Sequence, residues 1–187
     1  MSVVVNRKTK VFNIKVDGLF NLELPNTVDE DYYVFIWSKT KRYFCYESKD
    51  RSIHKVRINK GIIQKLPYRA NQYVFDQCSF HEGYDIHFPG NCDVDIIKSR
   101  FVGRCKFTGQ IDQLIISAEQ FENCGTIDLS SCQIKTLIIK NMPEVVKLPT
   151  SVVDMKLMSC PEWIIDVNQL PQLMNFQSDC KVRIPVV

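Results

Sequence analysis

Two stretches of the sequence decide the fold, because they superpose without a gap: KLPYRANQYVFDQC, Lys65 to Cys78, and KLPTSVVDMKLMSC, Lys147 to Cys160. Both begin with Lys-Leu-Pro and end with cysteine. The apolar residues between these ends also coincide, Tyr73 with Met155 and Phe75 with Leu157. Such an internal repeat predicts an architecture in which each copy folds as one unit and stacks on its neighbours.

Short apolar clusters recur about every ten residues from Val74 to Ile184, the spacing of short strands joined by tight corners. Several clusters alternate apolar and polar residues, as in Ile127-Asp128-Leu129, which is typical of a strand with one buried face. Turn-forming residues such as Pro89-Gly90 separate the clusters,. The pattern therefore predicts an all-β protein.

The similarity returns after about twenty residues, which predicts two strands per coil and parallel stacking of coil upon coil, as in a β-solenoid. The nineteen residues from Cys105 to Cys124 and the twenty from Cys160 to Cys180 fit a ladder of inward-facing cysteines. An antiparallel β-sandwich, which also has short strands at this spacing, is the alternative.

The repeat resembles the short, proline-bearing leucine-rich repeat, with an L-P corner followed by an L-x-L strand and a buried cysteine. The residues that carry this resemblance are Leu148, Pro149, Met155, Leu157 and Cys160. The resemblance covers Leu66 to Val187 and implies a solenoid that offers a rigid recognition surface. The stretch SRFVGRCKFTG, Ser99 to Gly109, is similar instead to pentapeptide-type β-helices.

We predict an N-terminal β capping region over residues 1–60, since an open solenoid end would expose strand edges. Residues 61–187 are expected to form solenoid or leucine-rich-repeat-like coils around one continuous core. The residues expected inside this core are Leu66, Phe75, Leu114, Ile116, Leu129, Leu137, Ile139, Met155 and Leu157.

The composition is that of an ordinary globular protein, with 45% hydrophobic residues, 24% charged residues and a net charge of +3 over 187 residues,. No apolar run has the length of a signal-peptide core or a membrane span, so we expect a cytoplasmic protein without membrane insertion. In a reducing compartment the eight cysteines are expected to be free thiols, with a disulfide framework as the alternative,.

Charge is distributed unevenly along the chain. Between Ser38 and Ala70 ten Lys and Arg residues face two acidic ones, a local charge of +8 against −5 for the rest of the chain. Basic residues interleaved with aromatic ones suit contacts to phosphates and stacking on bases. The predicted polyanion-binding residues are Lys39, Lys41, Arg42, Lys55, Arg57 and Lys60. The alternative is a solvated face that protects edge strands, a common use of lysine.

Four residues have metal-ligand chemistry and the spacing C-x2-H-x5-H-x4-C: Cys78, His81, His87 and Cys92,. Packing is the favoured interpretation, because Cys160 fills the position of Cys78 in the other copy without any histidine nearby. His87 lies between two apolar residues and should face outward on a strand. We therefore expect no bound metal and no other cofactor.

No phosphate-binding loop, nucleophile elbow, zinc-protease motif or dinucleotide fingerprint occurs in the chain,. We expect a protein that is not an enzyme and that binds protein partners as a scaffold, as in a larger assembly such as a virion. A nucleic-acid-binding or other polyanion-binding module that uses the basic segment is the alternative.

Overall fold

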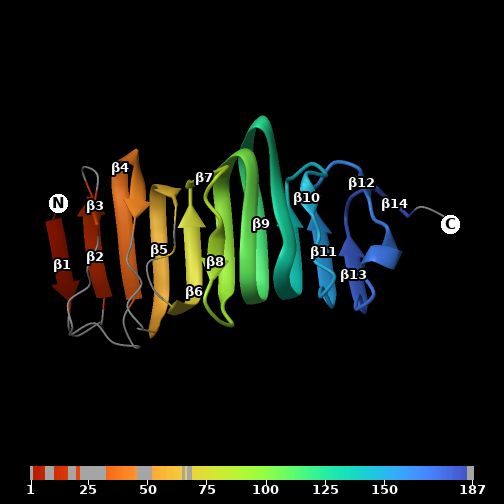
Figure 1. Ribbon diagram of the computed structural model, residues 1–187, viewed down its shortest axis with the longest axis horizontal. Helices are drawn as coiled ribbons and strands as arrows, with labels where there is room; N and C mark the ends of the chain where they lie inside the picture. The colour runs from red at the N-terminus through yellow and green to blue at the C-terminus, as the bar shows by residue number, and fades with distance from the viewer. Residues whose placement is uncertain are drawn as a thin grey trace.

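Parallel strands stack along one axis and form a β-solenoid of about six turns (Figure 1). This computed structural model describes residues 2–6, 11–16, 20–21, 33–45, 52–64, 66 and 69–184, and side chains within residues 34–36, 54–64, 66 and 69–184. In these ranges the one helix is a 3-10 turn, and no helix is long and apolar enough to cross a membrane.

The chain contributes its elements in the order of their stacking. The first strands are β1 (Ser2–Asn6), β2 (Val11–Val16), β3 (Phe20–Asn21), β4 (Tyr33–Cys45), β5 (Ser52–Ile63), β6 (Arg69–Asp76), β7 (Ser79–His81) and β8 (Ile86–Phe88). The later elements are β9 (Asp93–Lys140), β10 (Val146–Lys147), β11 (Asp154–Met158), β12 (Trp163–Ile164), η1 (Val167–Gln169), β13 (Asn175–Ser178) and β14 (Val182–Arg183).

Equivalent residues of successive coils lie side by side. Val56 of β5 pairs with Tyr73 of β6, which pairs in turn with Val94 of β9, and all three side chains are buried. Among the described strands, the pairings between different strands are parallel except that of β1 with β2. The predicted all-β solenoid is confirmed, and the antiparallel sandwich is wrong because neighbouring strands run in the same direction.

One coil contains three strand segments where the sequence predicted two. β6, β7 and β8 each pair with β9 at an offset of twenty-one residues. Only Gln77 and Cys78 separate β6 from β7, and neither is a residue typical of turns. The corner between them therefore leaves no signal in the sequence.

Left-handed backbone turns the chain at this corner in several coils. The residues and their φ angles are Lys60 (60°), Gln77 (55°), Lys98 (47°), Asn141 (54°) and Ser159 (53°). Non-glycine residues adopt this conformation at a cost of about 1–3 kcal/mol. Hydrogen bonds to the next coil offset the cost: the Gln77 amide donates to the Ile97 carbonyl at 2.9 Å, and the Asn141 amide donates to the Met158 carbonyl at 2.9 Å.

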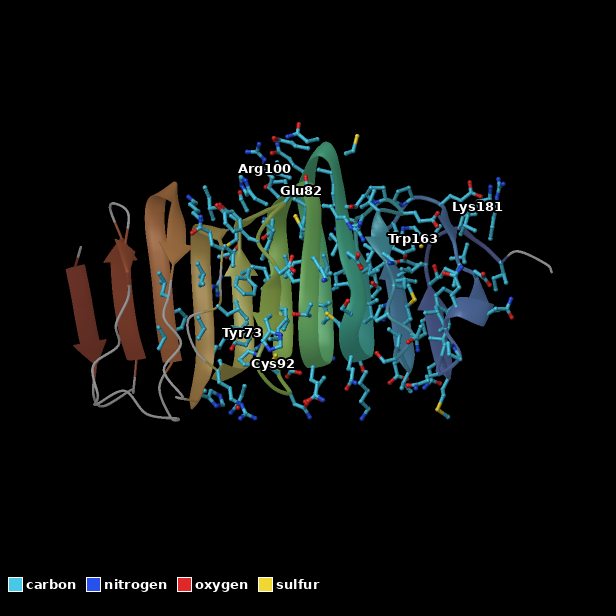
Figure 2. The ribbon with its side chains drawn as sticks, in the orientation of Figure 1. Tyr73, Glu82, Cys92, Arg100, Trp163 and Lys181 are labelled. Atoms are coloured by element: carbon cyan, nitrogen blue, oxygen red, sulfur yellow. The ribbon has the colours of Figure 1, made fainter. Side chains whose placement is uncertain are left out.

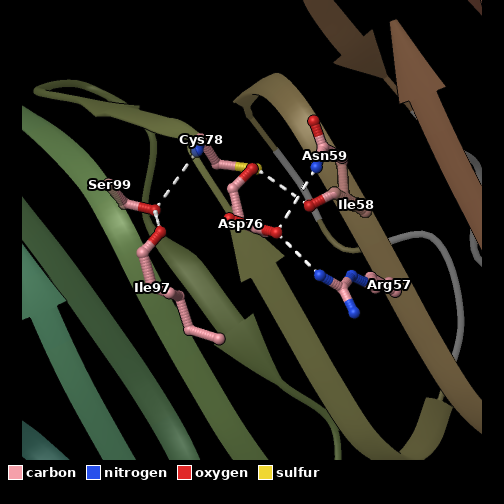
Figure 3. Close-up of polar contacts among 7 residues, drawn as sticks. All are labelled: Arg57, Ile58, Asn59, Asp76, Cys78, Ile97 and Ser99. Carbon is pink, nitrogen blue, oxygen red and sulfur yellow. Dashed lines mark hydrogen bonds and ion pairs between the residues drawn. The ribbon is translucent and has the colours of Figure 1, made fainter.

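A small side chain with a polar hydrogen follows three of these corners, and these residues are Cys78, Ser99 and Cys160. The Cys78 thiol donates to the Ile58 carbonyl of the preceding coil at 3.3 Å, and the Cys160 thiol donates likewise to the Ile139 carbonyl at 3.6 Å. Ser99 accepts a hydrogen bond from the Cys78 amide at 3.2 Å (Figure 3). The superposition of the two repeat copies is confirmed, because their terminal cysteines make the same contacts.

The core runs the length of the solenoid between the stacked strands, and every residue predicted for it is buried. Aromatic rings form columns inside it. Phe80 stacks on Phe101 at 5.2 Å between ring centroids, and Phe101 stacks on Phe121 at 5.6 Å. Isoleucine is more frequent than leucine at these inward positions, and valine and phenylalanine fill many of the others, so the likeness to leucine-rich repeats stays a prediction.

One part of the predicted cysteine ladder is wrong. Cys105 is buried, but Cys124 is exposed and has a φ of 54°, next to Asn123 with a φ of 52°. In this coil β9 extends beyond the other coils as a loop (Figure 1), and the extra length carries Cys124 out of the core. The seven cysteines whose side chains the structure describes are free thiols.

The parallel stacking already includes β2, β4 and β5. Antiparallel pairing, which would distinguish a cap from the coils, is limited to β1 and β2 among the described strands. The division into a capping region over residues 1–60 and coils over residues 61–187 stays a prediction.

Replacing Leu157 by alanine tests the register of the coils. Leu157 is fully buried and pairs with Ile139, so Leu157→Ala should lower the free energy of unfolding by about 2–5 kcal/mol through lost burial and a cavity. Lys156→Ala, on the outward side of β11, is the control and should change it by less than about 0.5 kcal/mol. Equal effects of the two changes in chemical denaturation would contradict the register.

Candidate interaction surfaces

Three of the predicted basic residues, Lys55, Arg57 and Lys60, lie on the outward side of β5. Lys55 and Arg57 alternate with buried residues of β5, so their side chains share one side of the sheet, and Lys60 is exposed at a left-handed corner. The side chains of three further predicted residues lie outside the described part of the chain: Lys39, Lys41 and Arg42. The structure thus brings together part of the predicted polyanion site.

Acidic residues of the following coils lie on the same side. The Arg57 guanidinium donates to the Asp76 carboxylate at 2.7 Å (Figure 3). Lys55 pairs in register with Gln72, and Gln72 pairs with Asp93. Because these carboxylates come from later in the sequence, the count of charges between Ser38 and Ala70 misses them. We name Lys55, Arg57 and Lys60 the basic face. Its positive charge is partly compensated by carboxylates of the following coils.

The four candidate metal ligands occupy separate environments. Cys78 is buried at its corner, whereas His87 is exposed on β8, as predicted, with its Nδ1 3.0 Å from the Thr108 hydroxyl. Cys92 is buried, and its thiol donates to the Gln110 carbonyl at 3.7 Å. His81 lies half-buried on β7. Within the described ranges no group of three or more His, Cys, Asp and Glu side chains is placed to hold a metal ion.

Burial also makes the inner thiols poor nucleophiles. Desolvation raises the pKa of Cys92 to about 12, with Asp93 adding to the effect, and it raises the pKa of Cys105 to about 11. Since the thiolate is the reactive form of cysteine, these side chains are suited to packing. Figure 2 shows Cys92 beside Tyr73 within the coils.

Asp128 is a buried carboxylate that joins three coils. It is 4% exposed, it contacts Arg104 at 2.5 Å from one coil before, and Lys147 lies 4.0 Å away in the coil after. Burial by itself raises the pKa, but hydrogen bonds from Ser130 and Arg104 outweigh it, and the pKa falls to about 2. A strongly shifted pKa sometimes marks a functional site. Here the partners satisfy the carboxylate, which indicates a structural role.

A shallow groove of about 360 Å³ crosses two coils of β9 and the residues that precede β11. Amide side chains form much of its lining: Asn91, Gln110, Gln133 and Gln172. Gln110 donates to Gln133 at 3.1 Å, so two of these amides already satisfy each other. The charged side chains of the lining, Asp112 and Lys135, are both exposed. The groove therefore holds no buried charge that would select a ligand.

The last coil carries all of the large hydrophobic side chains that are exposed in the described part of the chain. They are Ile164, Val167, Met174, Phe176 and Ile184, and we name this set the C-terminal end surface. Met174 is 80% exposed and Ile184 is 54% exposed. Single exposed hydrophobic residues are ordinary, but a cluster of them marks an interaction surface.

The backbone at the same end is open. β13 pairs with β11 and is the last strand of the large sheet, and β14 pairs with β12 in the small sheet. Neither strand has a further partner among the described residues. β13 has the sequence NFQS, which contains no charge and no proline, the residues that commonly block the pairing of an edge strand,.

Charged groups around this end are compensated within the coil. Lys181 lies 3.4 Å from Glu162, and Arg183 also forms an ion pair with Glu162. The Asp179 carboxylate accepts a hydrogen bond from the Ser159 amide at 2.6 Å. Figure 2 shows Lys181 at this end, with Trp163 nearby. The surface thus combines exposed apolar side chains with a rim of paired charges.

Sequence reasoning did not find the C-terminal end surface. Phe176 pairs with Met155 and continues an inward column. The apolar pattern around Phe176 in the sequence is therefore the same as that around a buried residue. The alternation in the sequence shows which side of a strand a residue occupies and does not show whether another coil covers it.

No family model, no curated protein and no solved structure matches this chain. The chemistry of the surface alone therefore supports the functional proposal.

Changing Asp128 to asparagine tests the carboxylate as a clamp between coils. The folded-state pKa of about 2 lies below the ordinary value of 3.8, so the carboxylate stabilises the fold above that ordinary value and loses this contribution as the pH falls towards about 2. Asp128→Asn should lower the free energy of unfolding at neutral pH by about 1–3 kcal/mol. The difference from the wild type should shrink in acid.

Asp85→Asn is the control, because Asp85 is an exposed carboxylate 3.8 Å from Lys106, and such pairs contribute about 0–1 kcal/mol. Chemical denaturation at a series of pH values measures the free energy of unfolding of the wild type and of both variants. A difference for Asp128→Asn that stays constant from neutral to acid pH would contradict the role of its charge.

Proposed function

We propose that this protein is a non-enzymatic interaction scaffold that binds a protein through the C-terminal end surface. The observation that carries the proposal is the gathering of all five exposed large hydrophobic side chains of the described residues in one coil. Elsewhere in that part of the chain the outward positions are mostly polar or charged. Contacts between proteins bury such apolar centres inside a polar rim.

The chemistry of the inner residues fits a scaffold. The thiols of Cys92, Cys105 and Cys132 have a raised pKa because burial disfavours the thiolate, and the Asp128 carboxylate is held by its partners. These groups stabilise the coils and are not directed towards a ligand. A role in a larger assembly such as a virion, and a cytoplasmic location, belong to the same proposal and depend on the sequence expectations alone.

Site-specific photo-cross-linking tests the surface. A photoreactive phenylalanine analogue at Phe176, which is 37% exposed, should form cross-links to another protein chain in native extract. The same analogue at His87, exposed on β8 in the middle of the solenoid, is the matched control and should form none. Cross-linking that is equal at the two positions would contradict a binding site at the C-terminal end.

The basic face supports a second candidate, a polyanion-binding module. This candidate is supported by the position of Lys55 and Arg57 on one side of β5, where the Arg57 side chain is 41% exposed. The ion pair with Asp76 opposes this candidate, since a phosphate would have to compete with a carboxylate already in place.

Replacing Lys55 and Arg57 by glutamate tests the second candidate. If the face binds polyanions, the double variant should weaken binding to single-stranded oligonucleotides by a similar factor for all sequences and flatten the dependence on salt. Fluorescence anisotropy at about 50 mM salt measures both quantities. Lys135→Glu, at an exposed position outside the basic face, is the control. Absence of binding by the wild-type protein would remove this candidate.

A further inference from the structure

Two of the exposed residues at the C-terminal end, Phe176 and Ile184, continue the buried columns of the coils before it. Phe176 pairs with Met155, which is only 2% exposed. Ile184 follows Arg183, the partner of Ile164, and so lies next to the buried Ile165. Both side chains have the geometry of core residues, and they are exposed because no further coil in the described chain covers them.

These residues belong to both sheets of the last coil. Phe176 lies on β13 of the large sheet, and Ile184 follows β14 of the small sheet. Val167 lies on η1 at the same end (Figure 1). A single extended peptide that added to β13 would leave the residues of β14 and η1 uncovered. The partner that covers them all needs a cross-section comparable to that of the solenoid.

The C-terminal part of the chain has a low net charge, so the C-terminal end surfaces of two copies can approach each other. Residues 151–187 contain four acidic and three basic residues, a net charge of −1. Two C-terminal ends can therefore meet with little electrostatic repulsion.

The register of β13 restricts how two copies can join. In an antiparallel pair, directly opposite residues point to the same side of the sheet. Two identical strands that pair in this way are related by a two-fold axis. Inward residues of one copy must lie opposite inward residues of the other, so the axis passes between two copies of the same residue. With Phe176 on the axis, the two Phe176 rings meet on the core side, and Asn175 lies opposite Gln177 on the outer side.

From these observations we propose that the C-terminal end surface binds the same surface of a second copy of this chain. The two solenoids join tail to tail through antiparallel pairing of their β13 strands, so that one core runs through both copies. This inference depends on the proposed function, because it names the partner of the same surface.

The test uses the purified full chain in sedimentation equilibrium over a range of concentrations. The wild type should sediment as a reversible dimer. Phe176→Glu would bury an unpaired charge at the centre of the interface, and it should weaken dimerisation by about a hundredfold or more. His87→Glu, exposed in the middle of the solenoid, is the control and should leave the dimer unchanged. Circular dichroism of each variant should match the wild type.

A cysteine at position 176 checks the register. The two residues on the axis of an antiparallel pair lie within the distance that a disulfide spans, about 4.4–6.8 Å between Cα atoms. Phe176→Cys should therefore give a covalent dimer on mild oxidation, and Gln177→Cys, whose side chain lies on the outer side and off the axis, should give much less. The wild type shows the background from the native thiols.

Three outcomes would overturn the inference. A wild type that stays monomeric at all concentrations excludes the second copy, and cross-links from Phe176 to a different protein would then still support the proposed function. Assemblies that grow without limit would indicate contact between the C-terminal end and the N-terminal end. A dimer that survives Phe176→Glu uses another surface.

Discussion

Parallel pairing between coils is the constraint on which the rest of the structure depends. Each coil must return the chain to a position one strand spacing further along the axis, with its inward side chains beside those of the coil before. Tyr73, Phe75 and Val94 are buried because this condition is met. The coil length of about twenty residues, the corners and the columns of rings all follow from it.

The corners show how strictly this condition acts. The chain must change direction at each corner, and Gln77 and Asn141 adopt left-handed backbone there although neither is glycine. Hydrogen bonds from their amides to the next coil hold the turn in place. Cys78 and Cys160 then satisfy a carbonyl of the preceding coil with a thiol small enough to fit. Strain at each corner is thus offset by contacts between coils.

In a solenoid each inner coil is covered by a neighbouring coil on both sides, whereas a terminal coil is covered on one side only. At the C-terminal end Phe176 occupies a core position and is partly exposed, and β13 has an open edge. Along the sides, charges from different coils compensate one another, as Arg57 with Asp76 and Arg104 with Asp128 do. Such pairs compensate part of the charge along the sides, and we propose the C-terminal end as the surface that binds a partner.

The sequence by itself determined the repeat, the strand class and the inward residues, because a period of two along a strand and of about twenty along the chain are properties of local order. Leu157 and Ile116 could be assigned to the core for this reason. Only the tertiary structure decided which residues meet across coils. Asp76 compensates Arg57 from nineteen residues away, and Cys124 leaves the cysteine ladder because one coil is longer. Phe176 has the pattern of a buried residue, and its exposure depends on whether a neighbouring coil covers it, a fact that no local pattern contains.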